Sequence, residues 1–295
     1  MRRWTGSVAA CLVLLALPSA AAAGACDAYD EHPQEMGRLP AVLPELSGLA
    51  ASRRHAGVYW AHNDSGHELA LYAIRENGTL VASFPLRGAS AVDPEDIATG
   101  PCAAASPRSC IYLADTGDNL HGRKRVQILR VEEPDELRGR PLTATSLPFA
   151  YADDTHDVEA LLVDPRSAEV YVVTKTLFSL GDLYRVEGLR PRAFGTAVRL
   201  EAVDAPPELD ALTTAASVHP DGDRVLLRTY RFVWEFRRPG ASRLADVLAT
   251  RPIKVPTVGP GLGEAVGYTA DGTGYLLGGE GDRSALFRVT CRPLP

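Results

Sequence analysis

Residues 157–186, which read DVEALLVDPRSAEVYVVTKTLFSLGDLYRV, decide the fold. Three short segments, residues 158–161, 170–174 and 182–186, are rich in valine, leucine and tyrosine and are separated by short polar stretches. Runs of this length and composition predict β-strands, and turns between successive strands predict antiparallel pairing. No stretch of the chain has convincing helical periodicity. The segment therefore predicts one small antiparallel sheet.

The same unit recurs along the 295-residue chain. Each first segment carries a carboxylate or serine, then a small or acidic residue, then an aliphatic residue. These segments are residues 46–49, 94–97, 158–161, 209–212 and 263–266. The steps of 48 to 64 residues between them match the size of a propeller blade. The pattern predicts an all-β protein, a β-propeller of four-stranded antiparallel blades. Five blades are counted, and the longest step leaves six possible.

The last repeat ends near Cys291 without room for a fourth strand. We therefore expect an N-terminal strand, around residues 35–41, to complete that sheet and close the ring. The predicted organisation is an N-terminal segment over residues 24–44 and a propeller over residues 45–295. A β-sandwich is the less favoured alternative, because its strands need not recur as grouped units.

The first 23 residues have the features of a signal peptide. Arg2 and Arg3 precede an apolar stretch over residues 9–17 and a run of small residues over 18–25. The apolar stretch is too short to cross a bilayer, so we expect a secreted or extracytoplasmic protein without a transmembrane segment. Residues 23–26, AGAC, partly resemble a lipobox, so lipid anchoring at Cys26 remains an alternative.

Four cysteines remain after removal of the signal peptide, an even number that suits an oxidising compartment. Cys102 and Cys110 flank a short polar stretch between two apolar segments, so a bond between them would close a loop. That pairing leaves Cys26 with Cys291, which would join the first ordered residues to the last. No cysteine spacing resembles a zinc site.

Composition restricts the class of partner. Basic residues number 31 and acidic residues 37, which gives a net charge of −6. No cluster of lysine and arginine is dense enough to follow a nucleic-acid backbone, so nucleic-acid binding is disfavoured. We expect a monomer that binds a small-molecule or protein ligand.

Antiparallel topology places many polar residues on one face. The start of each first strand and the end of each second strand lie at the same edge of a sheet. If first strands line the axis, Ser47, Glu95, Glu159, Asp210 and Glu264 form a ring at one mouth of the channel. Carboxylates so placed repel one another unless donors or a cation offset the charge, and Ca²⁺ is a candidate because it prefers oxygen ligands. A water-filled channel, with acidic groups that only satisfy backbone N–H groups, is the alternative.

Several motifs carry a family resemblance. ELSGLA at 45–50, WAHNDSG at 60–66, DPEDIA at 93–98, YLADTGDN at 112–119 and DVEAL at 157–161 resemble the SdiA-regulated and phytase-like group of secreted bacterial propellers. The resemblance is clearest over residues 45–190. It implies a calcium-associated acidic face, which in phytase-like enzymes carries phosphoester hydrolysis by metal-activated water. The residues that match are Glu95, Asp96, Asp115, Asp118, Glu159 and Lys175. Those relatives generally have six blades, where five are counted here.

Two functional hypotheses follow. The first is a non-catalytic propeller that binds a ligand or partner on the acidic face, with Ca²⁺ held by Glu95, Asp96, Asp115, Asp118, Glu159 and Glu264. The remaining residues expected on the ligand face are Asn63, Asp64, Asn119, Asp210 and Arg231. The second is a calcium-dependent phosphoesterase or esterase in which Glu159 and Lys175 are catalytic. The chain contains no Gly-x-Ser-x-Gly, Walker or His-Glu-x-x-His motif.

Overall fold

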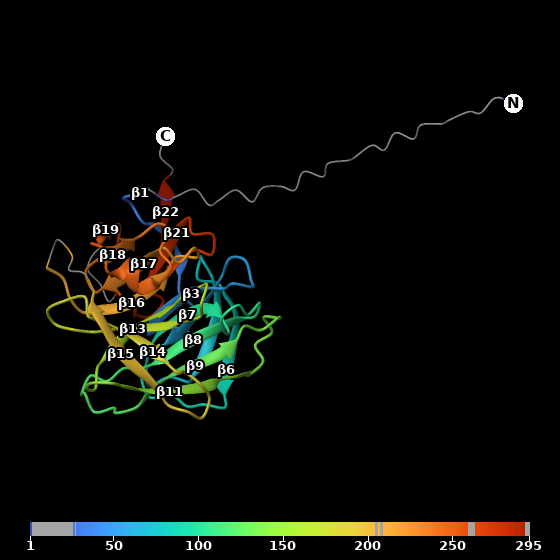
Figure 1. Ribbon diagram of the computed structural model, residues 1–295. Coiled ribbons are helices and arrows are strands. Elements are labelled where there is room, and N and C mark those ends of the chain that lie inside the picture. Colours follow the sequence, from blue (N-terminus) through green and yellow to red (C-terminus); the bar gives the residue numbers. More distant parts are fainter. Residues whose placement is uncertain (2–25, 27, 204–205, 207–208, 259–262, 293–295) are drawn as a thin grey trace.

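Four β-sheets form five blades around a common axis in the computed structural model (Figure 1). The sheet of eight strands contains two of the blades, whose outermost strands pair in parallel. It describes residues 1, 26, 28–203, 206, 209–258 and 263–292, so the expected signal peptide lies outside the described residues apart from Met1. Blade 1 comprises β3 (Leu46–Ala51), β4 (Val58–Asn63), β5 (Ala70–Arg75) and β6 (Leu80–Arg87), with β10 (Leu142–Thr143) parallel to β6. Blade 2 comprises β7 (Pro94–Pro101), β8 (Ser109–Asp115), β9 (Val126–Glu132) and β11 (Thr145–Tyr151). Blade 3 comprises β12 (Val158–Val163), β13 (Val170–Thr174), β14 (Asp182–Glu187) and β15 (Gly195–Ala202).

The remaining two blades complete the circle. Blade 4 comprises β16 (Thr213–Val218), β17 (Arg224–Thr229), β18 (Val233–Arg237) and β19 (Ile253–Val255), with the five-residue helix α1 (Leu244–Leu248) before β19. Blade 5 comprises β20 (Ala265–Tyr268), β21 (Gly274–Gly278), β22 (Ala285–Arg292) and β2 (Gln34–Arg38), and β1 (Ala28–Tyr29) also pairs with β22. In the described part of the chain, no helix is long and apolar enough to cross a membrane.

The ring is closed by contact between every pair of neighbouring blades. The first strands β3, β7, β12, β16 and β20 contact one another in that order, and β20 contacts β3. Five apolar core clusters fill the five spaces between consecutive blades. Every residue of β4, β12 and β17 is buried, because each blade is covered by a neighbour on both faces. The predicted five-bladed propeller is therefore confirmed.

The N-terminal segment closes blade 5, as the sequence predicts. Strand β2 pairs antiparallel with β22, and β1 lies beside the C-terminal end of β22 (Figure 1). Cys26 forms a disulfide with Cys291, so its sulfur is not free to carry a lipid. Arg224 of blade 4 also donates a hydrogen bond to the Cys26 carbonyl at 2.8 Å. The second predicted disulfide, Cys102–Cys110, joins the end of β7 to β8.

One register position recurs in the first strands. A β-bulge follows the opening residue of β3, β7, β12 and β16, and the extra residues are Ser47, Glu95, Glu159 and Thr214. The sequence-based alignment of blade 4 is therefore wrong, because Thr214 and not Asp210 occupies this position. Asp210 precedes β16, where its carboxylate accepts hydrogen bonds from Thr229 and the Trp234 indole. Residues 209–212, LDAL, imitate the repeat without belonging to it.

The axis itself is crossed by one side chain. Each first strand has an inner edge whose backbone groups lack a strand partner, and buried N–H groups need an acceptor. The fully buried carboxylate of Asp96 in β7 accepts hydrogen bonds from Leu161 N of β12 at 2.8 Å and Ala216 N of β16 at 3.0 Å. It also accepts from Ile97 N at 2.8 Å. Asp96 therefore ties blades 2, 3 and 4 together at the hub.

We predict that Asp96→Ala lowers the free energy of unfolding by about 3 kcal/mol or more, because it leaves the N–H groups of two other blades buried without an acceptor. Ser217→Ala serves as the comparison, since Ser217 Oγ accepts only the Tyr268 N–H, at 3.0 Å, and its loss should cost about 1 kcal/mol. Urea unfolding of both variants measures the difference. Equal stabilities for the two variants would contradict the role of Asp96.

Candidate metal and ligand site

A cluster of five carboxylates lies at one mouth of the channel, where first strands begin and second strands end. We call the loops around this mouth the acidic face. Asp64, Asp93 and Glu95 form one triad and Glu95, Asp157 and Glu159 another, and within each triad one oxygen of every residue lies within 4.8 Å of the others. Glu95 belongs to both triads. Glu95, Asp157 and Glu159 are at most 6% exposed, so three carboxyl groups are buried together.

The bulges place the two glutamates. Glu95 and Glu159 are the extra residues of β7 and β12, which are neighbouring first strands, so their side chains meet at the mouth. The loop after β8 packs against them. A Cβ on Gly117 would lie 1.9 Å from Glu95 Oε1 and 2.5 Å from Asp93 Oδ2, so only glycine allows these oxygens their positions.

Lys175 is the cation that contacts the cluster. It follows β13, and its Nζ donates to Glu159 Oε1 at 2.7 Å and to the Tyr230 hydroxyl at 3.1 Å. The pair is well shielded from water, because the side chain of Lys175 is 16% exposed and that of Glu159 is 7% exposed. One ammonium group offsets one carboxylate. The remaining four carboxylates of the cluster share no such ion pair among the described residues.

Burial and mutual repulsion shift the acidities of this cluster. Burial, followed by the charge of Glu159, raises the pKa of Glu95 far above its ordinary value. Burial also raises the pKa of Glu159, although Lys175 opposes the shift. The pKa values of Asp64 and Asp93 are raised as well, mainly by burial. The folded chain therefore holds these groups at an electrostatic cost that a bound cation would relieve.

Glu264 borders the cluster without joining either triad. It precedes β20 on the same face and is 8% exposed. Burial, followed by the charges of Glu159 and Glu280, raises its pKa to about 7. Beneath it, the fully buried Arg228 donates to the Ala265 carbonyl at 2.8 Å.

Three of the expected metal ligands have structural partners instead. Asp96 lies in the hub described above. Asp115 accepts hydrogen bonds from Val92 N, Asp93 N, Arg123 and Gln127, and so anchors the loop that carries Asp93. Asp118 accepts from Gly122 N and Arg123 N, each at 2.8 Å, within its own loop. These carboxylates shape the site and do not form part of the described triads.

The expected ligand-face residues divide similarly. Asp64 joins the cluster, whereas Asn63 accepts a hydrogen bond from Glu45 N and donates one to the Val42 carbonyl. Asn119 and Arg231 are exposed, and the Arg231 guanidinium lies over the Phe232 ring. Asp210 is held by Thr229 and Trp234. The structure thus brings together Asp64, Glu95, Glu159 and Lys175 from the sequence-based set.

Two members of the cluster, Asp93 and Asp157, are absent from the sequence-based set. Each stands two residues before a bulge glutamate, so Asp-x-Glu occurs at 93–95 and again at 157–159. That repeated spacing is the signal that identifies them. Asp157 also fixes the neighbouring loop, because its Oδ1 accepts a hydrogen bond from Asp118 N at 2.8 Å.

Exposed apolar side chains surround the acidic face. The large hydrophobic residues that are at least 43% exposed in loops of this face are Val42, Val92, Leu120, Leu177, Phe178 and Leu209. The other three exposed large hydrophobic residues in the described part of the chain lie elsewhere. A concentration of exposed apolar groups on one face is typical of an interaction surface. We refer to these six residues as the apolar rim.

Comparison with known proteins adds only general information. No protein-family model matches the sequence, and no curated protein matches it either. Among solved structures, the chain is similar to the soluble aldose sugar dehydrogenase of Escherichia coli in its apo-form, with 11% identity and a TM-score of 0.48. That alignment covers 88% of this chain and 99% of the dehydrogenase. A structure described as U3-55K aligns with 13% identity and a TM-score of 0.40, over 83% of this chain and 67% of that one.

The raised pKa of Glu264 predicts a specific pH dependence in metal-free protein. The folded state binds the Glu264 proton more tightly than the unfolded state, whose ordinary pKa is 4.5. The stabilising effect of protonation is complete below pH 4.5 and is lost as the pH rises to about 7. This loss amounts to at most about 3 kcal/mol. Thermal unfolding in EDTA at a series of pH values should show the decline. Glu264→Gln should make the decline smaller by the contribution of this residue, while Glu159 and the other carboxyl groups with raised pKa values keep theirs. An unchanged slope in this variant would contradict the assignment.

Proposed function

We propose that this protein is an extracytoplasmic β-propeller that binds Ca²⁺ at the acidic face and, through that face, a ligand or protein partner. The observation that carries the proposal is the pair of carboxylate triads that share Glu95. All five residues offer oxygen ligands, which suit Ca²⁺, and one lysine cannot offset their charge. Two disulfides support a location outside the reducing cytoplasm.

The fold itself does not require glutamates at the mouth. At the same bulge position, Ser47 donates to the Glu95 carbonyl of the next blade at 2.5 Å, and Thr214 donates to the Gly263 carbonyl at 2.7 Å. A short hydroxyl side chain is thus sufficient to connect neighbouring blades. In blade 2 the equivalent bond, to the Val158 carbonyl at 2.9 Å, comes from Thr116 because Glu95 is directed to the mouth. The buried glutamates therefore destabilise the chain without serving the ring, which supports a role in binding.

The apolar rim supports a ligand or partner that covers this face. Burial of apolar surface is the main favourable term in most protein associations. Exposed side chains such as Phe178, which is 85% exposed, would make this contribution when a ligand or partner covers them. Ca²⁺ bound by the triads would neutralise the centre of the surface while the rim supplies apolar contact. This combination of a central carboxylate cluster and an exposed apolar rim distinguishes the acidic face from a water-filled channel mouth and from an ordinary polar surface.

Calcium should raise the melting temperature of protein purified in EDTA, by about 5 °C when the ion is in 100-fold excess over its Kd. Glu95→Gln and Glu159→Gln should abolish this shift, because each removes a ligand of the triads. Glu95→Gln should also raise the melting temperature of metal-free protein, because it removes a carboxyl group that is costly to bury and has no cationic partner among the described residues, whereas Glu159→Gln also breaks the ion pair with Lys175. Glu68→Gln is the matched control, since it removes the same charge from an exposed position on the same face. If all three variants respond to Ca²⁺ as the parent does, the triads are not the site.

A calcium-dependent phosphoesterase is the second candidate, favoured by the position of Lys175 beside the carboxylates. In that chemistry the metal lowers the pKa of water, and a cation stabilises the developing negative charge. The first candidate expects no turnover of p-nitrophenyl phosphate with Ca²⁺. The second expects turnover that is lost in EDTA and falls by about 100-fold in Lys175→Gln but not in Arg231→Gln. Turnover that ignores EDTA and Lys175→Gln would exclude this site as its source.

A further inference from the structure

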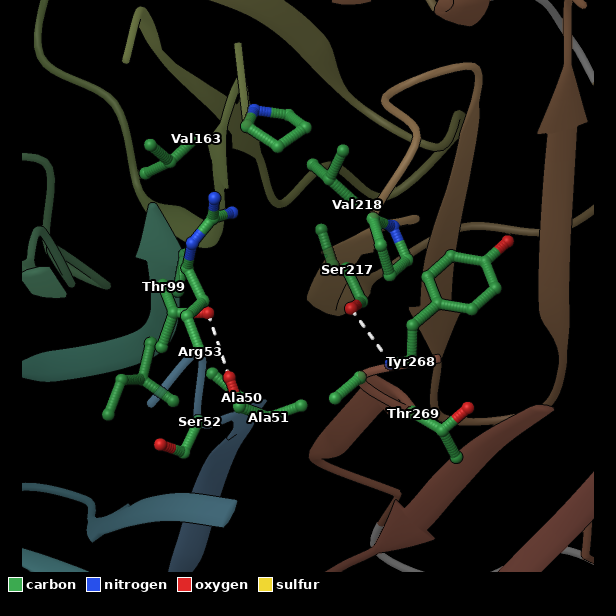
Figure 2. Close-up of a pocket in the computed structure, with 16 residues that line it drawn as sticks. Ala50, Ala51, Ser52, Arg53, Thr99, Val163, Ser217, Val218, Tyr268 and Thr269 are labelled. Carbon is green, nitrogen blue, oxygen red and sulfur yellow. Dashed lines mark hydrogen bonds between the residues drawn. The ribbon is translucent and has the colours of Figure 1, made fainter. Parts of the chain in front are cut away.

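A hollow of about 300 Å³ lies at the mouth of the channel opposite the acidic face. All five blades contribute to it, through the ends of their first strands and the residues that follow. Its wall is made of small and apolar residues, with alanines at 50, 51, 98, 216 and 270. Because these side chains are short, they cannot fill the space around the axis. Figure 2 shows the resulting hollow between Arg53 and Thr99 on one side and Ser217 and Tyr268 on the other.

Among the described residues that line this hollow, Arg53 is the only charged one. It makes no hydrogen bond or ion pair with the part of the chain that the structure describes. Its neighbour Arg54 behaves differently, because Arg54 pairs with Asp135. The hollow contains no carboxylate that could hold the Arg53 guanidinium. A guanidinium presents several N–H donors in a planar fork that matches a carboxylate.

Ser217 adds a second donor. Its Oγ accepts a hydrogen bond from Tyr268 N at 3.0 Å, which leaves the hydroxyl proton free to donate. Among the described residues, none accepts a hydrogen bond from this hydroxyl. Thr99, by contrast, donates its proton to the Ala51 carbonyl at 2.9 Å. The wall therefore offers positive charge and an O–H donor but no negative group.

We propose that this hollow binds a small monocarboxylic acid with an apolar body. The carboxylate pairs with Arg53, and the apolar body lies against Val163, Pro165 and the alanines, with the Ser217 hydroxyl on the opposite side of the hollow. A single guanidinium does not balance a polyanion such as a phosphorylated compound. The scarcity of polar groups likewise disfavours a sugar, whose hydroxyls would lose hydrogen bonds on burial. The site is independent of the acidic face, from which the Asp96 side chain separates it.

Two acids and a neutral analogue test the proposal: hexanoate, 3-phenylpropionate and 3-phenylpropanamide. Ligand-observed NMR with full-length mature protein in EDTA should detect both acids with Kd values below about 10 mM. The amide should bind at least about tenfold more weakly, because it lacks the charge. Acetyl-Gly-Phe with a free C-terminus distinguishes a peptide terminus from a free acid as the source of the carboxylate. Binding of only this peptide would reassign the ligand and overturn the small-acid proposal.

Arg53→Gln should weaken acid binding by about tenfold or more, and Arg54→Gln should change it by less than about twofold. Arg53 is exposed, so its replacement should leave the melting temperature unchanged and keep the test independent of folding. Arg53→Lys, which retains the charge but not the fork, should bind with intermediate strength. The proposal is overturned if the parent protein binds neither acid, if the amide binds as well as the acid, or if Arg53→Gln binds unchanged.

Discussion

The structure depends on hydrogen-bond partners for the backbone N–H and C=O groups at the inner edges of its first strands, which have no neighbouring strand. A blade that meets the axis ends in an unpaired strand edge, and the edges of five blades converge where water is scarce. Asp96 resolves much of this problem by accepting N–H groups from β12 and β16 as well as from its own strand. Burial raises its pKa despite these three donors, so its charge is costly to keep. The hydrogen bonds of this carboxylate connect three blades.

The same side chain divides the channel into two chemically different mouths. Along β7, Glu95 faces the acidic cluster, Asp96 crosses the axis, and Ile97, Ala98 and Thr99 line the opposite hollow. Successive residues of one strand thus reach two sites. The mouth with glutamates concentrates negative charge, and the mouth with alanines keeps open space beside a lone guanidinium. A larger side chain introduced next to Asp96 to change either site would therefore also disturb the hydrogen bonds that Asp96 makes at the axis.

The sequence predicts the ring well because the apolar segments and their turns recur along the chain. Each recurring unit is a small sheet that must bury both of its faces against neighbouring sheets. It predicts Glu95, Glu159 and Lys175 for the same reason, since antiparallel topology alone brings strand starts and ends to one face. It misplaces Asp210 because a Leu-Asp-Ala-Leu segment copies the repeat four residues too early, and only pairing with β17 shows that Thr214 is the equivalent residue. It also cannot separate Asp115 and Asp118 from true cluster members. Topology places Asp115 and Asp118 near the cluster. Their hydrogen bonds with Arg123 and with loop N–H groups, however, depend on how the loop folds and cannot be read from the sequence.

The bulge positions show which part of the acidic face belongs to the fold and which does not. If ring geometry demanded an acid there, Ser47 and Thr214 could not occupy the equivalent positions in blades 1 and 4. Both hydroxyls instead donate to the next blade, and blade 2 obtains the same bond from Thr116, a residue outside its first strand. The chain therefore has a neutral way to connect neighbouring blades and uses it at the bulge positions of blades 1 and 4. Glu95 and Glu159 lie in adjacent blades, each preceded two residues earlier by an aspartate, which concentrates the unrelieved charge at one point of the rim of the channel. A local, buried concentration of carboxyl groups that the ring does not need supports the proposal that this site binds a cation.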